Sequence, residues 1–152
     1  MKGERFTIDT NILVYFVHVA AGDWHQGAIS IIEAASVRDC WLTLQALSEF
    51  YVVTTGKRIL PRDVAASQIQ DWLELYPTIG YSAENVQEAL TIAVKTRASY
   101  WDALMCATAA GAGCRAILTE DMADGSFVGG IRVVRPFKEG SLTAAASELL
   151  GI

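Results

Sequence analysis

The sequence predicts an α/β fold, a three-layer α/β/α sandwich with a central, mainly parallel sheet. Short β-type runs alternate with longer segments of helical period, which is the pattern of a parallel sheet covered by helices. The chain has 152 residues, enough for one sizeable core, and we expect a single domain over residues 1–152. It contains no repeat, low-complexity segment or linker that would divide it.

The expected elements follow one another along the whole chain. We expect strands in the runs RFTI, CWLTL, PTIGY, CRAILT and IRVVRPF. We expect helices over residues 11–17, 25–35, 45–55, 61–76, 83–97, 101–112 and 142–150. Pro61 suits a first helical turn and Ser82 suits an N-terminal cap. Helix ends are suited by Gly56, Gly113 and Gly151.

The composition argues against several classes of protein. No apolar run approaches the ~18 residues of a membrane span, and MKGER leads straight into the first strand without a signal peptide, so we expect a cytoplasmic protein. Cys40, Cys106 and Cys114 match no zinc or C-x-x-C spacing, and we interpret them as reduced core thiols. The formal net charge of −5 gives no general attraction to nucleic acid. Any nucleic-acid function must therefore depend on local basic patches or bound cations.

Three acidic residues stand alone in apolar segments. Asp9 is the only acid in RFTIDTNILVYFV, and Glu49 is the only charge in CWLTLQALSEFYVVTTG. Asp102 is the only charge in ASYWDALMCATAAGAGC. A solvated helix face would carry more charges than these segments do. Because burial of an unpaired carboxylate is costly, each acid must have a partner, be protonated or lie at the rim of a cleft.

A divalent cation would allow these acids to lie together. Without one, their mutual repulsion would raise their pKa values. Mg²⁺ or Mn²⁺, hard cations that prefer oxygen ligands, meets that need. The segment AILTEDMADG adds further acids after another expected strand, and Asp9 and Asp121 then fall at carboxyl ends of strands, where sites form in α/β sheets.

Structural roles remain open for the same residues. Asp9 can cap the helix that follows it, and Asp102 can cap or begin its helix, where the dipole favours an acid. Glu120, Asp121 and Asp124 lie in a polar, glycine-containing segment and can be ordinary loop residues.

Four pieces of the sequence carry a family resemblance. They are I-D-T-N-I-L, S-E-F, Y-W-D-A-L, and L-T-E-D-M-A-D-G followed by I-R-V-V-R-P-F. Each piece is weak alone, but together, in this order, they cover nearly the whole chain and form a strong signal. They resemble the PIN-domain family of metal-dependent ribonucleases, especially the small toxins of VapBC-type toxin–antitoxin pairs.

The resemblance implies a central parallel sheet flanked by helices and metal-assisted hydrolysis of RNA phosphodiester bonds, which needs no Ser, Cys or His nucleophile. It implies that Asn11 and Thr119 assist the metal site and that Asp124 is an additional acid. The implied partners are an RNA substrate, a cognate antitoxin that masks the site, and a second copy of the chain in a homodimer. The implied ligands of Mg²⁺ or Mn²⁺ are Asp9, Glu49, Asp102 and Asp121.

Contact with RNA needs positive charge that the overall balance lacks. The candidates are Lys57, Arg58, Arg62, Lys95, Arg97, Arg132, Arg135 and Lys138. Arg97 is close enough to Asp102 along the chain to border the acidic cleft, whereas Lys57 and Lys95 also suit helix ends. Trp24, Tyr100 and Trp101 can stack on bases, but for Trp101, beside an apolar helix, we favour core packing.

Two other functions are alternatives to a nuclease. A receiver or aspartate-nucleophile phosphatase also gathers acids around Mg²⁺, but such a phosphatase needs a second acid where Asn11 stands. Both also need a lysine after a later strand, and AILTED offers none. The second alternative is a catalytically silent PIN-like domain that binds RNA or a protein.

Overall fold

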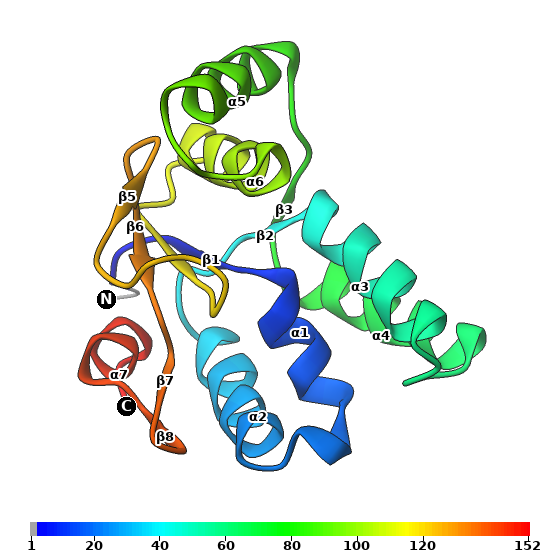
Figure 1. Cartoon of the computed structure of the whole chain (residues 1–152). Coiled ribbons are helices and arrows are strands. Elements are labelled where there is room, and N and C mark those ends of the chain that lie inside the picture. The colour runs from blue at the N-terminus through cyan, green and yellow to red at the C-terminus, as the bar shows by residue number, and fades with distance from the viewer. Residues whose placement is uncertain (1–2) are drawn as a thin grey trace.

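Parallel strands form the centre of the structure, a computed structural model that describes residues 3–152 (Figure 1). β1 (Phe6–Ile8) pairs with β4 (Ala116–Leu118), and β4 pairs with β6 (Ile131–Val134), all in parallel. β5 (Phe127–Val128) is antiparallel to β6, and the order of this four-stranded sheet is β1-β4-β6-β5. On the side of β1 away from β4, Phe6 forms a parallel bridge with Cys40. The chain after Cys40 forms β2 (Leu42–Thr43), which pairs in parallel with β3 (Thr78–Ile79).

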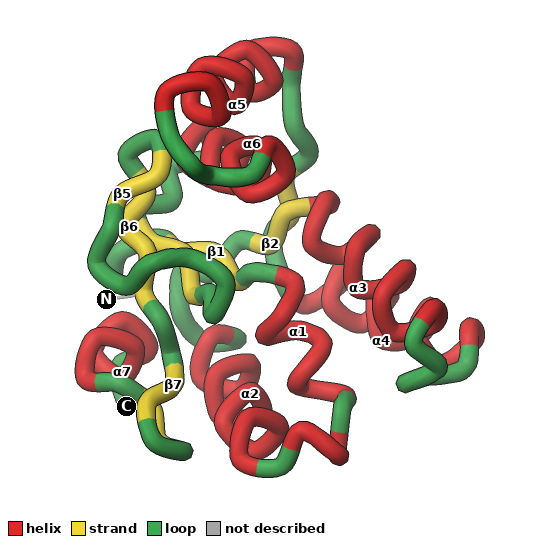
Figure 2. The backbone as a smooth tube through the Cα atoms, viewed as in Figure 1, coloured by secondary structure: helices red, strands yellow, loops and turns green. Residues whose placement is uncertain are grey.

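Helices lie on both sides of these strands, which confirms the predicted mainly parallel α/β architecture (Figures 1 and 2). They are α1 (Thr10–Val17), α2 (Asp23–Ala35), α3 (Leu44–Gly56), α4 (Arg62–Leu75), α5 (Ala83–Lys95), α6 (Tyr100–Gly111) and α7 (Ala144–Leu150), with one 3₁₀ turn, η1 (Val19–Ala21). In Figure 1, α5 and α6 pack together above the strands, α1 and α2 lie below them, and α3 pairs with α4 to the right.

The core lies between the strands and the helices. Every residue of β1 and of β4 is buried, as expected for parallel strands that are covered on both faces. Helix α6 is buried from Ala103 to Ala109 without interruption, because one side packs on the main core and another packs on α5. The mostly small side chains of this stretch let both neighbours come close.

The helix ends agree with local sequence chemistry. Ser82 and Asn85 form a reciprocal capping box at the start of α5, and Gly151 ends α7 in the left-handed conformation. All seven predicted helices are present, and the largest differences in their bounds are two residues, as at the start of α2. Cys40, Cys106 and Cys114 are buried and free, as predicted.

The prediction of one strand over IRVVRPF is wrong. β6 ends at Val134, and the chain continues into a separate antiparallel hairpin of β7 (Phe137–Lys138) and β8 (Ser141–Leu142). Pro136 has no N–H for the ladder, so it favours this break. The hairpin of β5 and β6 turns through Gly129 and Gly130, both at positive φ, as a two-residue turn requires. Among the described residues, no helix is long and apolar enough to cross a membrane.

Candidate functional site

A cavity of about 370 Å³ lies where β1 and β4 end. Four acids from four segments line it: Asp9 after β1, Glu49 in α3, Asp102 in the first turn of α6, and Asp121 in the loop after β4. The structure therefore brings together the four acids that the sequence singled out. None of them takes part in an ion pair within residues 3–152.

Asp9 is the most deeply placed of these acids, with 4% of its surface exposed. It caps α1: its Oδ1 accepts a hydrogen bond of 2.7 Å from the backbone N–H of Thr10. The capping bond thus uses one oxygen of the Asp9 carboxylate, and the other oxygen, Oδ2, accepts from side chains. Burial raises the pKa of Asp9 to about 6, and the nearby charges of Asp102 and Asp121 act in the same direction.

The Thr119 hydroxyl links Asp9 to the loop after β4 by hydrogen bonds. It donates to Asp9 Oδ2 at 2.7 Å and accepts from the backbone N–H of Asp121 at 3.1 Å. Asn11 Nδ2 lies 3.3 Å from both Asp9 Oδ2 and Thr119 Oγ1, and Asn11 Oδ1 accepts from the N–H of Glu120 at 3.4 Å. These bonds fix the two strand ends relative to each other.

Glu49 is held by two donors that the sequence analysis did not single out. Thr10 Oγ1 donates to Glu49 Oε2 at 2.7 Å, and Gln45 Nε2 donates to Glu49 Oε1 at 2.9 Å. The spacing of four residues between Gln45 and Glu49 on one helix face was a usable signal for the second bond. The bond from Thr10 could not be predicted from its place beside Asp9, because the contact of Thr10 with Glu49 depends on how α1 and α3 pack.

Asp102 lies at the start of α6, where Ser99 caps the helix by accepting from the backbone N–H of Asp102 at 3.1 Å. Burial raises the pKa of Asp102, and the charges of Asp121 and Glu49 add to this effect. One turn further along α6, burial raises the pKa of the Cys106 thiol to about 12, and the nearby acids reinforce the rise. The charges of the acids therefore raise the pKa values of one another and of the buried Cys106 thiol.

Two exposed basic side chains flank the acids. Lys57, just after α3, lines the same cavity as the four acids. Arg97 lines an adjoining cavity of about 390 Å³, to which Asp102 and Asp121 also contribute, so it borders the acidic cleft as the sequence suggested. Neither basic residue takes part in an ion pair within the described chain.

Asp124 and Glu120 have other contacts. Asp124 Oδ1 accepts a hydrogen bond of 2.9 Å from the backbone N–H of Arg135, and its side chain does not line the acidic cavity. Glu120 pairs with Arg135 at 3.0 Å and accepts from the N–H of Phe137 at 3.2 Å. Both acids therefore anchor the segment that follows β6.

The donor atoms of the cavity suit Mg²⁺ or Mn²⁺, since they are carboxylate oxygens. The raised pKa values of Asp9 and Asp102 show that burial and mutual repulsion disfavour their charged forms, which a cation would relieve. Within residues 3–152, however, no three Asp, Glu, His or Cys side chains already stand in metal-binding geometry. Mg²⁺ usually keeps several of its waters, which can bridge to carboxylates that are not in direct contact with it.

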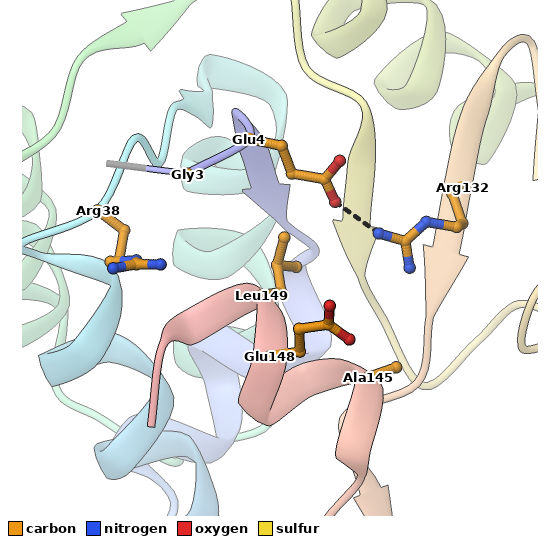
Figure 3. A pocket seen from close by; sticks show the side chains of 7 residues that line it. All are labelled: Gly3, Glu4, Arg38, Arg132, Ala145, Glu148 and Leu149. Carbon is orange, nitrogen blue, oxygen red and sulfur yellow. Dashed lines mark hydrogen bonds and ion pairs between the residues drawn. The ribbon is translucent and has the colours of Figure 1, made fainter. Parts of the chain in front are cut away.

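A different kind of pocket, of about 490 Å³, lies at the opposite edge of the sheet (Figure 3). Glu4 pairs there with Arg132 at 2.5 Å, while Arg38 and Glu148 lie on other walls. This pocket gathers charges of both signs and includes none of the acids singled out from the sequence. It therefore lacks the set of carboxylates that defines the cavity at the carboxyl ends of β1 and β4.

Comparison with known proteins identifies the family and supports the fold. Residues 6–123 match the PIN domain family. A solved structure of VapBC2 from Rickettsia felis, bound to a DNA fragment from their promoter, matches with a TM-score of 0.63 at 12% identity, over 85% of this chain and 96% of that chain. VapC20 from Mycobacterium tuberculosis, a Sarcin-Ricin loop cleaving toxin, matches with a TM-score of 0.62 at 14% identity, over 76% of this chain and 89% of that chain. No curated protein sequence matches this chain.

Proposed function

This chain belongs to the PIN domain family, and we propose that it is a Mg²⁺- or Mn²⁺-dependent endoribonuclease that hydrolyses RNA phosphodiester bonds at its acidic cavity. One observation carries the proposal: four carboxylates that are far apart in the sequence line one cavity and have no ion-pair partner within the described chain. The ligands we propose for the cation are Asp9, Glu49, Asp102 and Asp121.

The chain's own residues prepare these carboxylates. A bound divalent cation lowers the pKa of a coordinated water and stabilises charge that develops on a phosphate. Thr119 and the N–H of Thr10 orient the two oxygens of Asp9, and Thr10 and Gln45 orient those of Glu49. Since these bonds exist before any ligand binds, little reorganisation is needed when phosphate arrives.

Binding of RNA is assigned to the two basic residues that flank the acids. The chain carries a net charge of −5, so its overall charge does not attract an RNA phosphate backbone. Lys57 lines the acidic cavity and Arg97 lines the adjoining one, so both place positive charge near the acids. We propose that they hold the phosphates on either side of the scissile bond.

The test is cleavage of single-stranded RNA by purified protein with Mn²⁺ or Mg²⁺. We expect cleavage that EDTA abolishes and that Asp9→Asn removes. Glu148→Gln makes the same carboxyl-to-amide change in the pocket at the opposite edge of the sheet and should leave cleavage intact. Cleavage that persists in Asp9→Asn would contradict the proposal. A pure wild-type protein that binds RNA without cutting it would instead support the silent PIN-like domain.

We further propose that the chain is the toxin of a VapBC-type pair, acting on cytoplasmic RNA and masked by a cognate antitoxin. Its fold likeness to VapBC2 and VapC20 supports this role, and a homodimer is the assembly we expect. A small DNA-binding protein encoded by the neighbouring open reading frame, able to block RNA cleavage when co-expressed, would support the proposal. A neighbour that leaves cleavage unchanged would favour a nuclease without an antitoxin.

A further inference from the structure

We propose that the groove beside Glu49 is a stacking site for one unpaired base of single-stranded RNA, with Trp101 and Tyr81 as its aromatic walls. The groove has a volume of about 600 Å³. The inference rests on the proposed nuclease function, because it names how the same site would hold its substrate. Leu44 and Gln45 line the groove together with Glu49.

The groove and the acidic cavity are neighbours. Glu49 lines both, and Trp101 directly precedes Asp102, another lining residue of the acidic cavity. Gly80 and Tyr81 follow β3, so the groove lies at the carboxyl ends of β2 and β3. An RNA chain with a phosphate at the acids therefore carries an adjacent base to the groove.

Both aromatic side chains are open to solvent. Trp101 is 60% exposed and Tyr81 is 56% exposed, and the nearby Leu44 is 42% exposed. The sequence-based preference for core packing of Trp101 is therefore wrong: Trp101 lies on the outer side of α6, whose buried face begins at Ala103. Exposed apolar surface that gathers at a groove commonly marks a binding site.

Trp101 is held in place. Its ring meets the ring of Tyr100 edge-on, with centroids 5.3 Å apart, and its backbone carbonyl accepts a hydrogen bond of 2.9 Å from Gln45 Nε2. The same Nε2 donates to Glu49, so Gln45 ties the aromatic wall to the proposed metal ligand. The contact with Tyr100 restricts the ring, which lowers the conformational entropy lost when a base stacks on it.

A base suits the groove better than a purely apolar ligand does. Two aromatic side chains line the groove, which also contains the polar side chains of Gln45 and Ser48. Unpaired bases have both a ring face and N–H donors, and stacking on aromatic side chains tolerates any base.

The test compares two eight-residue probes: oligoadenylate, and a ribose-phosphate chain of the same length without bases. Binding is measured by fluorescence anisotropy in Ca²⁺ buffer, with intact RNA verified on a gel. We expect Trp101→Ala to bind oligoadenylate about tenfold more weakly than wild type does, and to bind the abasic chain equally well. Trp101→Phe should retain most of the affinity. Leu75→Ala, at an exposed apolar side chain on α4, should change neither.

The outcomes separate the stacking site from the nuclease function. If wild type fails to cleave RNA but Trp101→Ala still loses affinity only for the probe with bases, the stacking site stands alone. If wild type cleaves RNA but Trp101→Ala binds both probes like wild type, the stacking site is overturned and the groove is left to a protein partner. Equal losses on both probes would also overturn it, because they would indicate a general structural defect.

Discussion

At the edge of the sheet where β1 and β6 begin, Glu4 pairs with Arg132, and Asp39, just before β2, pairs with Arg5. At the edge where β1 and β4 end, the four acids of the cavity have no ion-pair partner within the described chain. The acids that line the cavity are thus left unneutralised, whereas Glu4 and Asp39 are paired at the other edge and Glu120, outside the cavity, pairs with Arg135. We call these two edges the amino edge and the carboxyl edge.

Acidic side chains cost free energy of folding at the carboxyl edge but not at the amino edge. The pairs at the amino edge are partly exposed and contribute little to stability, about 0–1 kcal/mol each. At the carboxyl edge, burial raises the pKa values of Asp9 and Asp102, so their ionised forms oppose folding near neutral pH. Such a penalty at one cavity is typical of a functional site.

The largest expected effect is on catalysis at the carboxyl edge. Glu49→Gln keeps the size of the side chain but removes a charge from the proposed metal ligands. We expect RNA cleavage to fall by about 10²- to 10⁴-fold, because charge stabilisation of the reacting phosphate is lost. Glu148→Gln at the amino edge is the control and should cleave like wild type. Equal activity of the two variants would contradict the assignment of catalysis to the carboxyl edge.

The second effect is on stability. The pKa of Asp9 in the folded protein, about 6, lies above its ordinary value of 3.8. Its contribution to stability is therefore complete below about pH 4 and is lost as the pH rises through 6. Asp9→Asn cannot ionise, so in EDTA at pH 8 we expect it to exceed wild type by up to about 3 kcal/mol in unfolding free energy. Urea unfolding at pH 4 and pH 8 measures this, and a gain that is equal at both pH values would contradict it.

The third effect is on metal affinity and concerns Thr119, a hydrogen-bond partner of Asp9. Thr119→Val keeps the shape of a fully buried side chain but removes the hydroxyl that donates to Asp9 Oδ2. We expect Mn²⁺ affinity and cleavage to fall by about 10- to 100-fold. Thr7→Val, at another buried threonine whose hydroxyl has no partner among the described residues, is the matched control. A loss of the same size in Thr7→Val would mean that core packing, rather than orientation of Asp9, is responsible.

The smallest effect concerns substrate binding. Lys57→Gln removes one positive charge from the acidic cavity and should raise KM for RNA a few-fold with little change in kcat. The slope of log affinity against log salt concentration should decrease by about one. Arg132→Gln, at the amino edge, should leave both quantities unchanged. If Arg132→Gln weakened RNA binding as much as Lys57→Gln does, RNA would contact both edges.

Much of the fold could be predicted because local chemistry and hydrophobic period agree along the chain. Ser82 and Asn85 encode a helix start within four residues, and β1 and β4 are continuous apolar runs because both of their faces are buried. The short hairpins escaped prediction. β7 and β8 have two residues each, and Pro136 interrupts what otherwise reads as one long strand. The Gly129-Gly130 pair was a usable signal for the hairpin of β5 and β6.

The convergence of the acids could be anticipated because isolation from other charges is visible in sequence. The partners of the acids could not, since Thr10 meets Glu49 only through the packing of α1 on α3. The exposure of Trp101 was missed because an apolar helix suggests burial for all of its residues. In the first turn of α6, Tyr100 packs against the core while Trp101 is exposed, and that difference depends on tertiary structure rather than on the sequence around Trp101.

The central claim is that the acids of the carboxyl edge share a divalent cation. Calorimetric titration of the metal-free protein with Mn²⁺ tests it most directly, with Asp102→Asn and Glu148→Gln as the paired variants. We predict that wild type and Glu148→Gln bind Mn²⁺ equally and that Asp102→Asn binds it at least tenfold more weakly. Equal Mn²⁺ affinity in all three proteins, or no Mn²⁺ binding by wild type, would contradict the claim.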